Sequence, residues 1–301
     1  MTGASLIKEI KLLADSEGID ALGFAEASEF AGYALNHAKR RNPKLSLPDA
    51  KTIIVAGIYI GGLTLPVWTD FRYGRTSRLY LSGFFLDVVK PLQPIAAFLK
   101  KEGYKTIICN SKTSDGSILP LKLAAIRAGL GWQGKHSLLI SKKYGTFLAL
   151  GGIITDADFD HNKEEESNHC GKCNNCREAC PLAALDQPYV LNVNYCLSYL
   201  LQSEDLPEKA RLVMGNRVGD CEICQHACPW NRKHLSRPVA TELGKSFQNK
   251  IEIWENLFHL NNLVKQTEEG YREAFGGLNT SIPYEIFHRN VLIAIENVKN
   301  L

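Results

Sequence analysis

The sequence predicts an α+β fold that carries a metal-binding segment. Three observations predict it: strand-like and helix-like patterns alternate over residues 1–158, eight of the nine cysteines crowd into residues 159–235, and helical patterns return over residues 236–301. Strands rich in Ile and Val that alternate with amphipathic helices favour a layered α/β or α+β domain. We therefore expect a layered domain, a metal-organised domain and a helical C-terminal segment with these boundaries.

The elements of the layered domain are predicted one by one. An opening helix is indicated by apolar residues at helical spacing from Leu6 to Ala14, closed by Gly18. Further helical patterns cover 86–103 and 119–129, and the C-terminal segment has two more, over 251–266 and 282–301. Strand-like or apolar runs follow the order DALGFA (20–25), KTIIVAGIYI (51–60), YKTIIC (104–109), HSLLIS (136–141) and FLALGGIIT (147–155). The patterns do not predict the order of the strands.

Composition excludes several classes of protein. With 45% hydrophobic and 22% charged residues, the chain is typical of globular proteins, and its apolar runs are too short to span a bilayer. The N-terminus lacks the pattern of a secretory signal, so we expect a cytoplasmic location. We also expect a monomer without a membrane segment. A net charge of +3 does not by itself indicate nonspecific nucleic-acid binding, and the basic clusters at 39–44 and 232–237 favour solvated surface over RNA phosphate contacts.

The cysteine spacing indicates two iron–sulfur clusters. CGKCNNCREACP has the bacterial ferredoxin spacing, in which the fourth cysteine binds the other cluster, and CEICQHACP is a second, shorter run. Three cysteines of the first run and the last of the second would bind one [4Fe-4S] cluster: Cys170, Cys173, Cys176 and Cys228. The second cluster would have Cys180, Cys221 and Cys224, and Cys196 in NYCLSYL completes its four ligands.

Two alternatives concern these cysteines. CxxC pairs also make structural zinc sites, although the Cys-Pro endings and the total of eight favour iron–sulfur. Cys109, in the apolar IIC, is expected to be a buried core thiol rather than a ligand. A plain ferredoxin has no large domain before its clusters, so the 158 preceding residues favour a reductase with a further redox group.

The sequence resembles the epoxyqueuosine reductases, which are cobalamin-dependent iron–sulfur enzymes that complete queuosine in tRNA. The resemblance rests on DGSILPLKLAAIRAGLGWQGKHSLLIS, CGKCNNCREACP, YCLSYLLQSE and VGDCEICQHACPWN, in this order. It implies a nitroreductase-like, cobalamin-binding α/β domain, shared with reductive dehalogenases, and a ferredoxin-like double-[4Fe-4S] domain. Cobalamin would be bound base-off between them, and an external donor such as ferredoxin or flavodoxin would supply electrons.

The resemblance also implies roles for single residues. The family has an aspartate thirteen residues before the alanine of AGLGW, which is Asp115 here, as proton donor to the opening epoxide; a loop or helix-capping role is the alternative. Tyr80 lies near a family tyrosine and is either a second donor or a packing residue. The implied corrinoid contacts are Arg40, Leu139, Ser198, Cys221 and Glu222.

Three hypotheses for the function follow. The first is reduction of epoxyqueuosine in tRNA, the second is a paralogue that reduces another epoxide or a halogenated small molecule, and the third is an electron-transfer protein that serves a partner. Family members usually have DxxP at 115–118, GKNT at 134–137 and a helical-repeat segment beyond the position of Leu301. These departures bear on the choice between tRNA and a small molecule.

Overall fold

The computed structural model describes residues 3–33, 35, 38–82, 88–109, 119–161, 165–275 and 282–299. The chain forms two compact units, which are described separately. The first unit contains Met1–Tyr59, Asp87–Gly134 and Leu138–Gly171, and the second contains Ile60–Leu86, Lys135–Ser137 and Lys172–Leu301. The chain therefore passes from one unit to the other several times.

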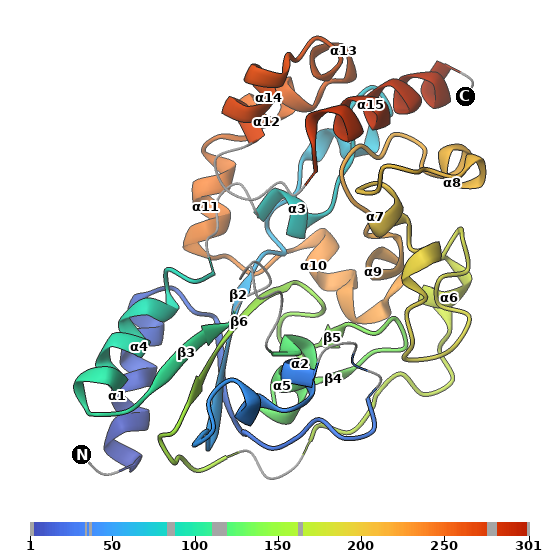
Figure 1. The fold of residues 1–301 in the computed structure, drawn as a ribbon. Coiled ribbons are helices and arrows are strands. Elements are labelled where there is room, and N and C mark those ends of the chain that lie inside the picture. Colours follow the sequence, from blue (N-terminus) through green and yellow to red (C-terminus); the bar gives the residue numbers. More distant parts are fainter. Residues whose placement is uncertain are drawn as a thin grey trace. The chain divides into compact units, whose positions relative to one another are not determined.

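The first unit is built on a four-stranded sheet, in the order β1-β2-β6-β3 (Figure 1). Every neighbouring pair in this sheet is antiparallel, which confirms the α+β class. The expected strands all form, and the run at 136–141 contributes to a separate two-stranded ladder, β4-β5. The bounds are β1 Ala21–Glu26, β2 Thr52–Tyr59, β3 Thr106–Cys109, β4 Trp132–Gln133, β5 Leu139–Ile140 and β6 Leu148–Thr155.

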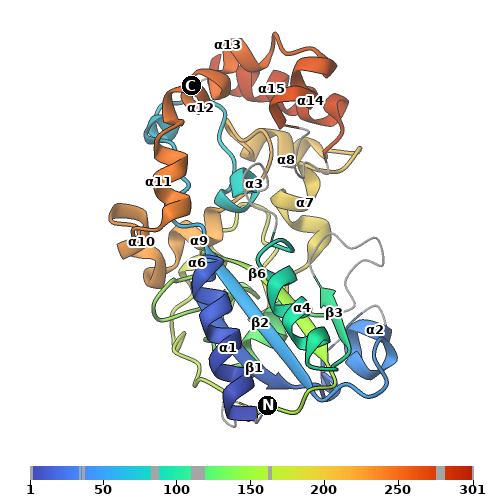
Figure 2. The same cartoon turned by 90° about the vertical axis from the view of Figure 1, so that its left-hand side faces the viewer.

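Helices cover both faces of this sheet (Figure 2). Helices α1 (Gly3–Ser16) and α4 (Leu92–Lys101) pack together, and α5 (Leu121–Arg127) packs against β1, β2 and β6. Two adjacent glycines of β6 face opposite sides of the sheet. A Cβ on Gly151 would lie 2.8 Å from Leu92 Cδ1. A Cβ on Gly152 would lie 3.1 Å from Leu119 Cδ2, just before α5. The absence of side chains at both positions allows close packing on either face.

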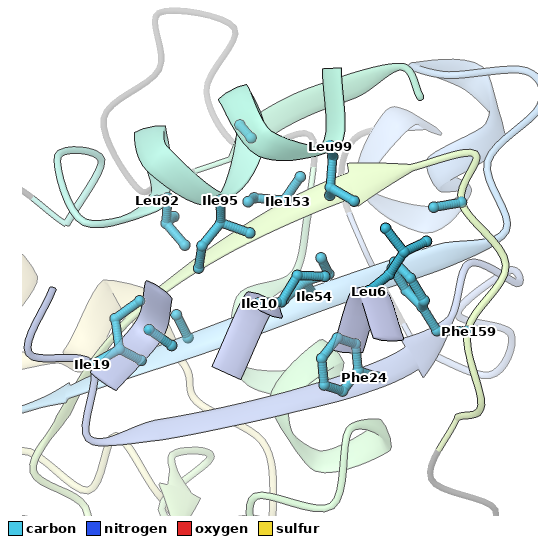
Figure 3. Packing of buried hydrophobic residues seen from close by; sticks show 14 residues of the cluster. Leu6, Ile10, Ile19, Phe24, Ile54, Leu92, Ile95, Leu99, Ile153 and Phe159 are labelled. Carbon is cyan, nitrogen blue, oxygen red and sulfur yellow. The ribbon is translucent and has the colours of Figure 1, made fainter. Parts of the chain in front are cut away.

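The core of the first unit is apolar and fills the space between the sheet and the helices α1 and α4 (Figure 3). Phe24 and Phe159 close one end of it, with ring centroids 5.6 Å apart in an edge-on arrangement. Burial of such a side chain contributes roughly 1.5–3 kcal/mol, so this core is the main source of stability in the unit. Its almost fully buried members are Leu6, Ile10, Ile54, Leu92, Ile95, Leu99 and Ile153.

Two predictions made for this unit can be compared with the structure. Cys109 is 1% exposed, and burial raises the pKa of its thiol to about 12, so the expectation of a core thiol is confirmed. A helix was predicted over 86–103, and among the described residues the helix begins at Leu92, after Pro91. A proline disfavours helical conformation in the residue before it, which explains the later start.

The second unit is largely helical. Its principal helices after the cysteine region are α11 (Glu242–Gln248), α12 (Ile251–Phe258), α13 (Leu260–Leu263), α14 (Glu268–Phe275) and α15 (Tyr284–Lys299). The prediction of a single helix over 251–266 is wrong. His259 leaves the helical conformation (ψ 125°), and its Nδ1 accepts a hydrogen bond from Asn261 N at 3.3 Å. The chain therefore forms two helices there.

Helix α15 is joined to the cysteine region by a buried amide. Asn290 is fully buried, and its Nδ2 donates to the carbonyls of Leu201 at 2.7 Å and Val218 at 3.0 Å. Because a buried amide without partners is costly, these bonds specify where the helix lies on the cysteine region. Within the described ranges, none of the helices has the length and apolar character needed to cross a membrane.

Candidate double-cluster site

Seven of the eight clustered cysteines belong to the second unit, and Cys170 lies at the end of the first. Cys176 lies on α6 (Asn175–Glu178), Cys224 lies on α9 (Ile223–Ala227), and these two short helices pack against each other (Figure 1). Cys228 is the C-cap residue of α9 and precedes Pro229. The two cysteine runs, about fifty residues apart in sequence, therefore meet in space.

Five thiols of the second unit lie within electrostatic reach of Cys224 or are Cys224 itself. Burial raises the pKa of Cys224 well above its ordinary value, and Cys221, Cys196, Cys180 and Cys176 raise it further. Burial likewise raises the pKa of Cys196, with Cys180 among the neighbours that add to it. Four of the five thiols, Cys180, Cys196, Cys221 and Cys224, are the ligand set expected for the second cluster, and Cys176 is an expected ligand of the first. Such mutual repulsion between thiolates is what bound iron neutralises, so the donor set fits a cluster.

Backbone N–H groups are directed at several of these sulfur atoms. Ala184 N donates to Cys180 Sγ at 3.3 Å. Cys196 precedes α7 (Leu197–Leu200), whose first N–H groups, including that of Ser198, act to lower the pKa of the Cys196 thiol. Ile223 N–H has the same effect on Cys221, against the larger effect of burial. Hydrogen bonds to cluster sulfurs tune the reduction potential of a bound cluster.

A single metal ion has no comparable site here. Among the residues that the structure describes, no three His, Cys, Asp or Glu side chains converge closely enough to hold one ion. These side-chain positions do not by themselves distinguish zinc from iron–sulfur.

A buried ion pair lies next to the second cysteine run. The side chains of Arg78 and Glu222 are 2% and 3% exposed, and Arg78 Nη1 donates to Glu222 Oε2 at 2.5 Å. Burial raises the pKa of Glu222, but Arg78 and then His226 outweigh it, so that the pKa lies below its ordinary value. The carboxylate of Glu222, an expected corrinoid contact, is thus already engaged within the protein.

Asp220, the residue before Cys221, accepts several hydrogen bonds. It accepts hydrogen bonds from Ser77 Oγ, from the Ser198 side chain and from Cys221 N, the last at 2.7 Å. Burial raises the pKa of Asp220 despite these bonds. Ser198, another expected corrinoid contact, is therefore placed beside two expected cluster ligands.

Tyr80 lies in the same polar region. Burial raises the pKa of its phenol well above the ordinary value, and Tyr271 and Asp220 raise it further. Its ring also lies so close to Gly219 that a Cβ there would be 2.9 Å from the ring carbons. The phenol is enclosed by protein groups of the second unit.

Arg40 and Leu139, two further expected site residues, lie in the first unit. Arg40 is on α2 (Ala38–Arg41), and its buried Nε has no hydrogen-bond partner among the described residues. Leu139 is on β5 and is 4% exposed. Ser137, just before it, has a left-handed φ of +66°, and its buried Oγ also has no partner in the described part of the chain. Asp115 lies outside the described residues.

Two residues at this site were not identified from the sequence. Lys135, in the AGLGWQGK motif, donates from Nζ to the carbonyl of Cys173. The motif itself was a signal, although it did not indicate this contact. Arg78 carried no signal, because a charged residue in RTSRLY is equally compatible with an exposed surface.

Comparison with known protein families resolves the nature of the cysteine site. Residues 169–231 match the family model described as a 4Fe-4S double cluster binding domain. Iron–sulfur clusters rather than zinc are therefore the metal centres of this segment.

Relatives extend the match over most of the chain. The epoxyqueuosine reductase of Lactococcus garvieae is 33% identical over 249 residues, which cover 76% of this chain and 70% of the relative. That of Prochlorococcus marinus is 31% identical over 266 residues, covering 80% and 83% of the two chains.

Solved structures show the same fold. The epoxyqueuosine reductase of Streptococcus thermophilus superposes with a TM-score of 0.80 at 27% identity, over 97% of this chain and 81% of that one. An epoxyqueuosine reductase in complex with an epoxyqueuosine-modified tRNA stem loop gives 0.82 at 25% identity, over 99% and 83%. A catabolic reductive dehalogenase shares the fold at a TM-score of 0.51 and 17% identity, over 83% and 36%. From its sequence relatives and its fold, this chain belongs to the epoxyqueuosine reductase family.

Proposed function

We propose that this protein reduces the epoxide of epoxyqueuosine in tRNA to give queuosine. The observation that carries the proposal is the meeting of the two cysteine runs, where α6 packs against α9, in a chain that belongs to this family. Removal of an epoxide oxygen as water consumes two electrons and two protons. The protein must therefore supply both an electron path and a proton donor.

The electron path consists of the two clusters. We assign Cys170, Cys173, Cys176 and Cys228 to the first cluster and Cys180, Cys196, Cys221 and Cys224 to the second, within residues 159–235 as the cluster domain. The match to the double-cluster family model and the packing of α6 against α9 support this assignment. A ferredoxin or flavodoxin is the proposed donor, and the protein is proposed to act as a cytoplasmic monomer.

The second redox group is cobalamin, held by the N-terminal domain (residues 1–158) together with groups from the cluster domain. The proposed contacts are Arg40, Leu139, Ser198, Cys221 and Glu222. Arg40 Nε, which is buried and has no partner among the described residues, fits a polar ligand, because buried polar groups normally have partners. When bound, cobalamin supplies the nucleophilic low-valent metal chemistry that opens the epoxide.

Asp115 and Tyr80 are the proposed proton donors. A carboxylic acid at Asp115 donates at neutral pH only if burial raises its pKa, which a site closed by cofactor and substrate would provide. Tyr80 is the weaker acid, because its raised phenol pKa opposes release of the proton. Its enclosure by Tyr271 and Asp220 also favours a packing role.

The test is direct conversion of substrate. Anaerobically purified protein, loaded with cobalamin and reduced, is mixed with tRNA that contains epoxyqueuosine, and queuosine is measured by mass spectrometry. We expect queuosine with the unaltered protein and none with Asp115→Asn, which should still bind cobalamin. Turnover of small epoxides or halogenated compounds, without conversion of tRNA, would identify a paralogue instead. Electron transfer to a partner with no conversion of any substrate would identify a carrier.

A further inference from the structure

Lys135 begins a three-residue segment that belongs to the cluster-bearing unit, although the chain on either side of the segment does not. The segment Lys135–Ser137 groups with the second unit, whereas Gly134 before it and Leu138 after it belong to the first. A short segment of the AGLGWQGKHS motif is thus built into the surroundings of the cysteines. The contacts of its lysine show what it does there.

The ammonium group of Lys135 contacts the first cysteine run directly. Nζ donates to the carbonyl of Cys173 at 2.8 Å and to Asn174 Oδ1 at 3.3 Å, and both contacts are partly buried. Asn174 Oδ1 also accepts from Arg177 Nη1 at 3.2 Å. The ammonium group is therefore held by the loop that carries Cys173.

The main chain of the same residue binds a second loop. The carbonyl of Lys135 accepts a hydrogen bond from Tyr189 N at 2.9 Å. Tyr189 lies in the connection between Cys180 and Cys196 and has a left-handed φ of +70°. Lys135 thus connects the loop of Cys173 with the segment that leads to Cys196.

We propose that the Lys135 ammonium holds the first cysteine loop and raises the reduction potential of the cluster bound there. The proposal rests on the assignment of Cys173 to the first cluster made above. Reduction adds one negative charge to the cluster, so a nearby cation stabilises the reduced form more than the oxidised form. Lys135 is a positioning residue in this role, because it acts through the cluster and not on the substrate.

The same loop offers a matched control. Lys172 lies between Cys170 and Cys173 in sequence, carries the same charge and is exposed to solvent. Water and salt screen an exposed charge much more than a partly buried one. The two lysines therefore separate the effect of a held, partly buried cation from that of nearby charge in general.

The experiment compares the full-length variants K135Q, K135R and K172Q with the unaltered protein. Iron content is measured first, and the clusters are then titrated with reductant and followed by electron paramagnetic resonance. A Cys196→Ala background, in which the first cluster remains, identifies the signal that shifts. For K135Q we expect roughly a tenfold lower reduced-to-oxidised ratio of that cluster at fixed potential, which is about 59 mV for a one-electron couple. The reduction potential of the first cluster in K135R and in K172Q should stay close to that in the unaltered protein.

Each outcome decides the proposal. Loss of iron in K135Q, with full iron in K135R and K172Q, supports it, because the first cluster then requires this cation. K135Q with full iron and an unchanged potential would overturn it. An equal shift in K172Q, or in K135R, would also overturn it. Unaltered protein with both clusters but without queuosine formation would contradict the proposed function and leave the Lys135 measurement valid.

Discussion

Both units of the molecule have an apolar core, but they differ in the charged side chains that they bury. The sheet core of the first unit is made of Leu, Ile and Phe side chains, including Ile54 and Ile153, which are fully buried. The cysteine region of the second unit buries charges instead, among them Arg78, Glu222 and Asp220. Apolar burial stabilises a fold without further partners, whereas buried charges require pairing. The second unit is therefore expected to depend on ion pairs and bound iron in addition to its apolar core, and the first unit on its apolar core alone.

The cysteine-bearing part of the second unit has short helices, although α15 of the same unit, with 16 residues, is longer than α1. The cysteine-bearing helices α6 and α9 have four and five residues, whereas α1 and α4 have 14 and 10. Helices this short do not form alone in water, because the free-energy cost of helix nucleation exceeds the gain from the hydrogen bonds of one turn. Metal ligation that is coupled to folding supplies the missing free energy. Loss of ligands should therefore affect the second unit first.

The largest expected effect is that of Cys196→Ala. The protein should lose about four of about eight irons, since each [4Fe-4S] cluster needs four ligands. Thermal unfolding should show an earlier transition for the second unit, with the sheet of the first unit retained. Iron analysis and circular dichroism of anaerobic protein measure both effects.

Cys109→Ala is the matched control for that experiment. Cys109 is the ninth cysteine, and it lies in β3 of the first unit, 1% exposed. Its removal should leave about eight irons bound. Equal iron loss in the two variants, or full iron in Cys196→Ala, would contradict the ligand assignment.

The same contrast explains what the sequence could predict. Periodic apolar patterns indicated β1, β2 and β6 to within about two residues, because apolar side chains at strand or helix spacing report burial directly. The antiparallel order β1-β2-β6-β3 could not be predicted, since pairing between distant strands leaves no local pattern. Cysteine spacing indicated the two clusters, which the match to the double-cluster family model confirms, because cluster ligation constrains that spacing.

Polar contacts between distant residues were not predictable. Arg78 and Glu222 are 144 residues apart, and nothing in either local sequence marks them as partners. The contact of Lys135 with the Cys173 carbonyl spans 38 residues and depends on how the chain passes between units. Such pairs are specified by the tertiary fold, which the local patterns do not contain.

Substitution of Arg78 tests the dependence of the second unit on paired charge. Arg78→Met leaves Glu222 buried beside His226 without its main partner, and we expect a loss of about 3–5 kcal/mol of unfolding free energy. Denaturant unfolding of iron-loaded protein measures it. Arg72→Met is the control, because Arg72 pairs with Asp70 at the surface with 72% of its side chain exposed. An equal shift of both variants would contradict the comparison.

The pH dependence of stability should depend on His234 in α10 (Arg232–Ser236). Burial, followed by the charges of Lys233 and Arg78, lowers its pKa to about 4. The unfolded chain binds a proton near pH 6.5 that the folded chain does not, so stability is fully present above 6.5 and is lost as the pH falls toward 4. His234→Gln should therefore lose less stability than the unaltered protein between pH 7.5 and 5. Parallel pH profiles would remove His234 as the cause.

The smallest expected effect belongs to the first unit. Ile153→Val removes one methylene from the core between β6 and α4, at a cost of about 0.5–1.5 kcal/mol. Because neighbouring side chains there are apolar, the loss should be the same with and without bound iron and should not vary with pH. Denaturant unfolding of both forms, followed through the transition of the first unit, measures it. A loss that grows when iron is removed would show that the apolar core also depends on the clusters, and the two units would then not differ in the way argued above.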